Sequence, residues 1–298
     1  MNTTGSTASG QRDGQQDAQH IRRPVVAGRF YPDSPAELQS MLRAYLDEAA
    51  APPQKPTLLA MVPHAGYVFS GAVAGCTLAQ AMLPQTLFVL GPNHTGRGSG
   101  IAVWPEGVWR TPLGDVPVDN ALAAEFCALC APARPDTLAH SAEHSLEVVL
   151  PFLQLRVPRV RIVPVSIGDP SLAVLTAAGA AMAQIIRRAA QTADPGGQNR
   201  IAMVVSSDMT HFLPQDEARR LDAMALEQVT ALNPQGLYTT VREKRISMCG
   251  VLPMTAALEA CRLLGATGAR LTRYATSGDI TGKTDSVVGY AGALVDVP

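Results

Sequence analysis

Three histidines in the sequence each follow an apolar run. The runs are LLAMVPH, which ends at His64, TLFVLGPNH, which ends at His94, and IAMVVSSDMTH, which ends at His211. Apolar runs of this kind, bounded by Pro, Gly, Asn and Ser, are typical of strands buried on both faces of a sheet. In an open α/β sheet, ligands bind in the crevice at the carboxyl ends of the strands. We therefore expect these imidazoles, half of the six in the chain, to lie in one site.

His64 and His94 lie in short motifs suited to holding an imidazole in place. PHAGY surrounds His64 with a proline and two small residues, and GPNH turns the chain sharply before His94. Neutral imidazoles on adjacent strands suit Fe, Cu or Zn. The two motifs therefore predict a metal site that needs a third ligand, and Tyr67 and Asn93 beside them are candidates for the substrate pocket.

The residues alone leave the third ligand open. Its candidates are Glu143, His144 and Glu147 in EHSLE, Asp208, and Cys249 in MCG. A Glu and a His in one helical turn can face a pocket, but acids at the start of a helix also interact with its dipole. Cys249 precedes a glycine and a predicted helix, and a helix N-terminus favours a thiolate.

Asp208 stands three residues before His211, close enough to orient the imidazole of an acid or base catalyst. Ser206 or Ser207 with the same two residues could form a hydrolase triad, although no GxSxG elbow presents either serine. HExxH and a GxGxxG after a strand are absent from the sequence, and SGDITGKT departs from the P-loop pattern by one position.

Composition excludes several classes of protein. Lys and Arg number 24 against 25 Asp and Glu, without the positive excess of a nucleic-acid-binding protein. The apolar runs are shorter than the roughly 18 residues that span a bilayer, so we expect no membrane segment and a cytoplasmic location. Five scattered cysteines predict no disulfide framework. Cys127 and Cys130 form a CxxC in an Ala-rich helical segment and are interpreted as packing residues.

The spacing of apolar residues predicts an α/β fold. A polar tail, residues 1–20, is expected to be disordered, and Ser34, Pro35 and Glu37 mark the start of a capped helix. The predicted strands are 58–62, 86–90, 101–104, 161–166, 201–205, 270–275 and 286–295, with helices at about 70–83, after Asp119, at 145–155, from Pro170 with Asp169 as cap, and between 206 and 269. Strands separated by helices predict a central, largely parallel or mixed sheet with helices on both faces. We expect a single domain over residues 21–298.

The ordered motifs together resemble those of the Memo family, whose prokaryotic members are called AmmeMemoRadiSam system protein B. The segments are VAGRFYP, VPHAGYVFSG, LGPNHTG, RTPLGDVPVD, EHSLEVVLPFL, SSDMTHF, MCG and SGDITGKTDSVVGYAGAL. The resemblance runs from about Arg22 to the C-terminus. It implies a fold similar to that of the class III extradiol ring-cleaving dioxygenases, with a metal site at one edge of the sheet.

The resemblance also implies roles for individual residues. His64 and His94 match the family's metal-site histidines, and Cys249 matches its cysteine ligand. His211 matches the acid/base histidine of the dioxygenases, with Asp208 beside it. His144 and Glu143 join Tyr67 and Asn93 as expected pocket residues. Iron(II) is the expected metal, while a thiolate ligand also suits copper or zinc.

These roles predict a metal-dependent, dioxygenase-like redox enzyme that acts on a small molecule. One alternative is a non-catalytic module that uses the same pocket to bind a peptide or partner protein. Another is a zinc hydrolase, in which Glu143 would serve as general base. The name of the prokaryotic proteins further implies association with an AMMECR-domain protein and a radical SAM protein.

Overall fold

The computed structural model describes residues 20–47, 53, 55–192 and 200–298. The predicted disordered tail lies outside these residues except for His20. In chain order the elements are β1 (Ile21–Arg22), α1 (Pro35–Asp47), β2 (Thr57–Val62), α2 (Tyr67–Ala79), β3 (Thr86–Pro92), β4 (Ile101–Val103), β5 (Val108–Thr111), β6 (Gly114–Pro117), α3 (Asn120–Leu129), β7 (Ala133–Pro135), α4 (Ser145–Arg156), β8 (Arg161–Ile167), α5 (Leu172–Gln191), β9 (Ile201–Ser206), β10 (His211–Leu213), α6 (Gln215–Thr230), α7 (Pro234–Glu243), α8 (Val251–Leu263), β11 (Arg270–Thr276), α9 (Ser277–Thr281) and β12 (Val287–Asp296).

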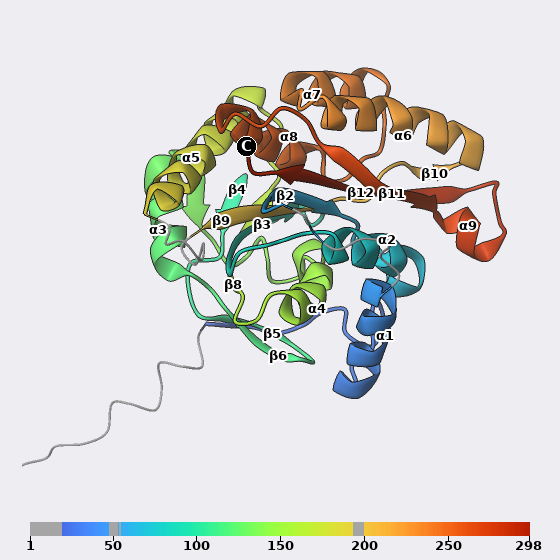
Figure 1. Ribbon diagram of the computed structural model, residues 1–298, viewed down its shortest axis with the longest axis horizontal. Coiled ribbons are helices and arrows are strands. Elements are labelled where there is room, and N and C mark those ends of the chain that lie inside the picture. The colour runs from blue at the N-terminus through green and yellow to red at the C-terminus, as the bar shows by residue number, and fades with distance from the viewer. Residues whose placement is uncertain (1–19, 48–52, 54, 193–199) are drawn as a thin grey trace, which may run out of the picture.

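The main sheet has the strand order β10-β12-β2-β9-β3-β8-β4-β7, with β11 also paired to β12 (Figure 1). Its centre, β2-β9-β3-β8, is parallel, while β12 and β4 join that centre in antiparallel orientation. Phe88 of β3 lies opposite Met203 on one side and Val163 on the other. The predicted mixed α/β sheet is confirmed.

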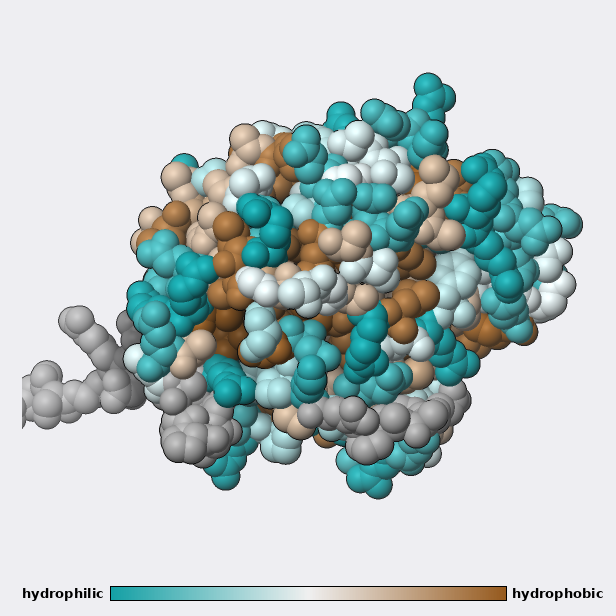
Figure 2. Space-filling view, turned by 45° about the horizontal axis from the view of Figure 1, so that its top comes forward, coloured by the Kyte–Doolittle hydropathy of each residue, from teal (hydrophilic) through white to brown (hydrophobic). Residues whose placement is uncertain are grey.

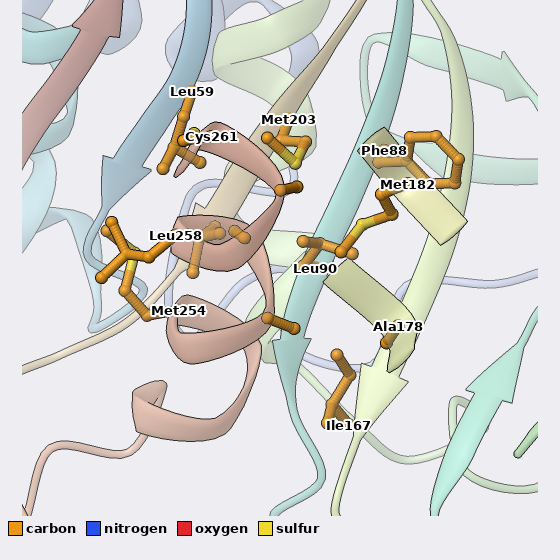
Figure 3. Packing of buried hydrophobic residues seen from close by; sticks show 14 of the residues in the cluster. Leu59, Phe88, Leu90, Ile167, Ala178, Met182, Met203, Met254, Leu258 and Cys261 are labelled. Carbon is orange, nitrogen blue, oxygen red and sulfur yellow. The ribbon is translucent and has the colours of Figure 1, made fainter. Parts of the chain in front are cut away.

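Alternate residues of the central strands face two different hydrophobic cores, because side chains point to opposite faces of a strand. Leu59 and Met61 of β2 pack with α3, α5, α6, α7 and α8, whereas Ala60 and Val62 pack with α1, α2 and α4. Figure 3 shows the first core, where Met254 and Leu258 of α8 lie over the sheet. Helices therefore cover both faces, which explains why these strands appear in the sequence as continuous apolar runs.

Several predicted boundaries were wrong. Helix α2 begins at Tyr67 and not at Ser70, because the Phe30 carbonyl accepts the N–H of Tyr67. Helix α5 begins two residues beyond Pro170, because the Asp169 carboxylate accepts the N–H of Ser171 in a turn before the helix. The turn-rich segment after β4 contains a hairpin, β5–β6, that forms a small second sheet with β1.

Helix α5 is the one described helix whose length and composition would allow it to cross a membrane. Leu175, Met182 and Ile185 on its apolar face are buried, and the helix packs against α8 and β9. The fold thus uses α5 as a core helix. Figure 2 shows apolar residues gathered near the centre of one molecular face, with polar residues along much of its margin.

Candidate metal centre

The predicted ligands His64, His94 and Cys249 come together at the carboxyl ends of the central strands. His64 follows β2, His94 follows β3, and Cys249 immediately precedes Gly250, the N-cap of α8. One donor atom from each residue lies within 4.8 Å of the other two, and Cys249 Sγ is 3.4 Å from His64 Nε2. The expectation that β2 and β3 are adjacent was wrong, because β9 lies between them.

The position of β9 explains how His64 is held. Ser206, the last residue of β9, donates its hydroxyl proton to the Ser145 carbonyl at 2.7 Å. Its oxygen is therefore free to accept the Nδ1 proton of His64 at 2.6 Å. This tautomer leaves Nε2 with its lone pair directed toward Cys249. Burial, together with the nearby His144 and His94, lowers the pKa of His64 well below its usual value and keeps the ring neutral.

His94 is held by the buried carboxylate of Glu143. Glu143 Oε1 accepts the Nδ1 proton of His94 at 2.9 Å, and Oε2 accepts the His94 backbone N–H at 2.6 Å. The same carboxylate accepts the N–H groups of His144 and Ser145. Burial raises the pKa of Glu143, but His94 and these N–H groups outweigh it and lower the pKa to about 2. Both histidines thus present Nε2.

Glu143 consequently supports a ligand and does not line the predicted substrate pocket. Glu143, His94 and His144 form a second group of donor atoms within 4.8 Å of one another. The carboxylate oxygens in that group already accept four N–H groups, so little of their capacity remains for a cation. The first group, with two imidazole nitrogens and a sulfur, is the better metal site.

Asp208 connects Cys249 and His64. Its backbone N–H donates to Cys249 Sγ at 3.1 Å, and its Oδ1 accepts the backbone N–H of His64 at 2.8 Å. Burial, with a contribution from the charge of Asp208, raises the pKa of the Cys249 thiol. The expectation that the helix N-terminus would favour the thiolate is wrong for the protein without a cation. A coordinated cation reverses this preference, since a metal-bound thiol loses its proton.

The predicted pairing of Asp208 with the His211 ring is replaced by another contact. The Ser247 carbonyl accepts the Nδ1 proton of His211 at 3.0 Å, and Ser247 Oγ accepts the His211 backbone N–H. Ser206 is hydrogen-bonded to His64, and the hydroxyl of Ser207 donates to the Asp208 carbonyl. The serine triad considered from the sequence is therefore not formed.

The other predicted pocket residues have different positions. His144 is partly exposed and stacks on His94, with ring centroids 5.0 Å apart, so it belongs to the site. Tyr67 is buried and donates its hydroxyl proton to the Val148 carbonyl, which directs its side chain into the core. Asn93 uses its side-chain amide to shape the loop after β3, where it bonds the backbone of Gly96 and Arg97.

Sequence patterns missed a buried ion pair beneath the site. Arg22 pairs with Glu147 of α4 and donates to the backbone carbonyls of Glu143 and His140. Glu147 also accepts the N–H groups of Val25 and Val26. The N-terminal segment is thereby fastened to the residues that hold His94. The available signal was Glu147, the single charged residue in the apolar run SLEVVLPFL.

Comparison with known proteins places the chain in a family. Residues 22–294 match the family described as Memo-like protein. The chain belongs to the Memo family. MEMO1 family proteins of Methanothermobacter thermautotrophicus and Methanocaldococcus jannaschii are each 39% identical to it, over 91% and 93% of this chain and 99% of each relative. A MEMO1 family protein of Aquifex aeolicus is 36% identical over 92% of this chain and 98% of the relative.

The Memo-family fold also resembles a solved structure. An uncharacterized protein from Escherichia coli K12 matches with a TM-score of 0.51 and 17% sequence identity, over 79% of this chain and 99% of that one. At this identity the likeness concerns the fold alone. It agrees with the predicted α/β class.

Proposed function

We propose that His64, His94 and Cys249 bind a transition metal, with iron(II) as the first candidate, in a dioxygenase-like redox enzyme that acts on a small molecule. The observation that carries this proposal is the convergence of two imidazole nitrogens and one thiol within 4.8 Å. Both imidazoles are fixed as Nε2 donors by hydrogen bonds at Nδ1, the arrangement typical of metal-ligating histidines.

Three protein ligands leave coordination positions for other molecules, as in catalytic metal sites. A bound redox metal would supply the electron-transfer chemistry with O₂ that side chains lack. His211 donates its Nδ1 proton to the Ser247 carbonyl, so its Nε2 can accept a proton from a substrate. Asp208 would fix the backbone of His64 and the position of Cys249, a role different from the one first expected.

Other functions are less well supported by the arrangement. For a zinc hydrolase, the residue expected to serve as general base is Glu143, and it is fully engaged with His94 and backbone N–H groups. A thiolate ligand is softer than a carboxylate, so copper and zinc remain competing outcomes for the identity of the metal. Association with AMMECR-domain and radical SAM proteins stays a prediction, as does a cytoplasmic location.

The metal content of protein purified without oxygen or chelators tests the centre. We expect about one metal ion per chain in the wild type and less than a tenth of that in His64→Ala and His94→Ala. Cys249→Ser should retain less metal and favour harder cations. His20→Ala and Cys127→Ser are matched controls, because both residues lie outside the donor groups. Wild-type metal content in all three ligand variants would show that the site is misassigned.

Oxygen consumption tests the reaction. Metal-loaded protein is incubated with a panel of catechols and other small oxidisable molecules, and O₂ uptake is recorded for wild type and His211→Ala. A redox enzyme predicts uptake that requires metal and falls at least about 100-fold in the variant, the usual contribution of a positioned acid or base. Peptide or partner binding that is indifferent to metal removal, without O₂ uptake, would instead favour a binding module.

A further inference from the structure

Phe212 occupies an unusual backbone position next to His211. It lies in β10 between His211, which is opposite Val288 of β12, and Leu213, which is opposite Val287. Since its two neighbours face consecutive residues of the partner strand, Phe212 is the extra residue of a β-bulge. Its φ is +62°, in the left-handed region, and its side chain is 75% exposed.

A glycine is the ordinary residue at such a bulge, because a side chain makes the left-handed conformation costly. Leu232 and Arg245 also have positive φ, but they follow the C-terminal ends of α6 and α7, where this conformation is common. The exposure of Phe212 means that burial of its ring does not offset the strain. An exposed aromatic ring held at a strained bulge points to a role in binding.

The surroundings of Phe212 indicate what it would bind. Its ring centroid is 5.7 Å from that of His211. Another aromatic side chain, Phe30, lies against His144 with ring centroids 5.0 Å apart. Phe69, which is 38% exposed, lies beside Gly66 in the segment that follows His64. Aromatic side chains thus lie beside His211 and His144 and in the segment that follows His64.

We propose that Phe212 is a specificity-determining residue that contacts the apolar, ring-bearing part of a small molecule whose polar group binds at His64, His94 and Cys249. The proposal rests on the metal centre proposed above. It assigns the substrate to a class: molecules with a metal-binding polar group attached to a planar apolar ring. The bulge holds the ring beside His211, where a glycine would fold equally well but offer no contact surface.

Two small ligands distinguish contact with Phe212 from binding to the metal. Imidazole can bind an open metal position, and 4-phenylimidazole adds one apolar ring to the same group. Isothermal titration of each into metal-loaded protein gives the ratio of their dissociation constants. We expect wild type to favour 4-phenylimidazole about tenfold, and Phe212→Gly to lose most of this preference while binding imidazole as before. Phe212→Trp should keep the preference. Leu129→Ala, which removes an exposed apolar side chain from α3, is the control.

Thermal unfolding of the metal-free variants supplies the second readout. Phe212→Gly should unfold at the same temperature as wild type or a few degrees higher, because glycine relieves the positive φ. A clearly lower unfolding temperature would make Phe212 a structural residue and overturn the inference. An unchanged ligand ratio in Phe212→Gly would also overturn it, with the metal centre intact. If neither ligand binds metal-loaded wild type, the metal centre itself fails, and the inference fails with it.

Discussion

The candidate metal centre and a second histidine site beneath it use the same side chain in opposite ways. In the centre, His64 and His94 are bonded through Nδ1 and present Nε2 to a shared space. His140 is fully buried against Trp104 and Trp109, and its Nε2 donates to the Ala102 carbonyl at 3.0 Å. Nδ1 of His140 has no hydrogen-bond partner among the described residues.

The difference shows that the hydrogen-bond partner, more than the residue type, decides what a histidine can do. Buried acceptors at Nδ1 leave Nε2 free to meet other donor atoms, which is the arrangement suited to a metal. The His140 ring has aromatic neighbours and a carbonyl at Nε2, so it serves packing. Arg22 links the two regions, since it stacks on Trp109, donates to the His140 carbonyl and pairs with Glu147.

Breaking this link should have the largest effect. Arg22→Met leaves the Glu147 carboxylate buried without its cation, and we expect a loss of about 3 to 5 kcal/mol in the free energy of unfolding. Urea unfolding followed by circular dichroism measures it. Arg188→Met, which removes an exposed partner of Glu125, should cost less than about 1 kcal/mol. Equal losses in the two variants would contradict a structural link through Arg22.

The sequence predicted the donor residues of the candidate metal centre better than it predicted the residues that hydrogen-bond to them. Strand ends could be located because apolar runs stop at Pro, Gly and Asn, and this placed His64 and His94 correctly. Strand order could not be derived, because pairing depends on contacts between distant segments. The insertion of β9 between β2 and β3 was therefore missed. Ser206 was considered only as a nucleophile for the same reason, although its position at that strand end makes it a partner of His64.

Cys249 and Asp208 show a second limit of prediction from the sequence. Local sequence suggested a thiolate at a helix N-terminus and a carboxylate beside His211. Burial instead raises the pKa of the Cys249 thiol, and the Asp208 carboxylate bonds the backbone of His64. Both outcomes depend on desolvation and on partners that are distant in the chain. Cys249 is 41 residues from Asp208, and Asp208 is 144 residues from His64. Local spacing carries no information on either.

Acid should affect stability through His140. Burial, moderated by the Ala102 carbonyl, lowers the pKa of His140 from 6.5 to about 4. Between these values the unfolded chain binds a proton that the folded chain excludes, so the free energy of unfolding falls as the pH falls. Arg22, Asp136 and Glu143 are the charged groups that act on this ring.

Through His140, the wild type should lose up to about 3 kcal/mol of its free energy of unfolding between pH 7 and pH 4. We expect His140→Gln not to show this loss. Glutamine does not titrate and can still donate to the Ala102 carbonyl. Urea unfolding at several pH values in that range measures the difference. A wild-type pH profile in His140→Gln would show that other groups cause the loss.

Glu143→Gln should weaken the metal centre without unfolding the protein. The amide keeps one acceptor oxygen, but it loses the second acceptor and the charge that stabilises His94 as an Nδ1 donor. We expect metal affinity to fall by about 30-fold, within the range for such supporting residues. Competition with a chromogenic chelator measures the dissociation constant. Metal affinity in His140→Gln should equal that of wild type, since His140 is not in either donor group.

Ser206→Ala should give the smallest effect and the sharpest test of how His64 is held. Alanine removes the acceptor for the Nδ1 proton, so the two neutral tautomers become closer in energy and the Nε2 lone pair is less populated. We expect metal affinity to fall about tenfold, with Ser206→Thr recovering most of it because the hydroxyl returns. Ser166→Ala serves as the comparison, because its buried hydroxyl bonds the Pro92 carbonyl and none of the donor residues. If Ser206→Ala and Ser166→Ala bound metal equally well, the tautomer of His64 would not depend on β9.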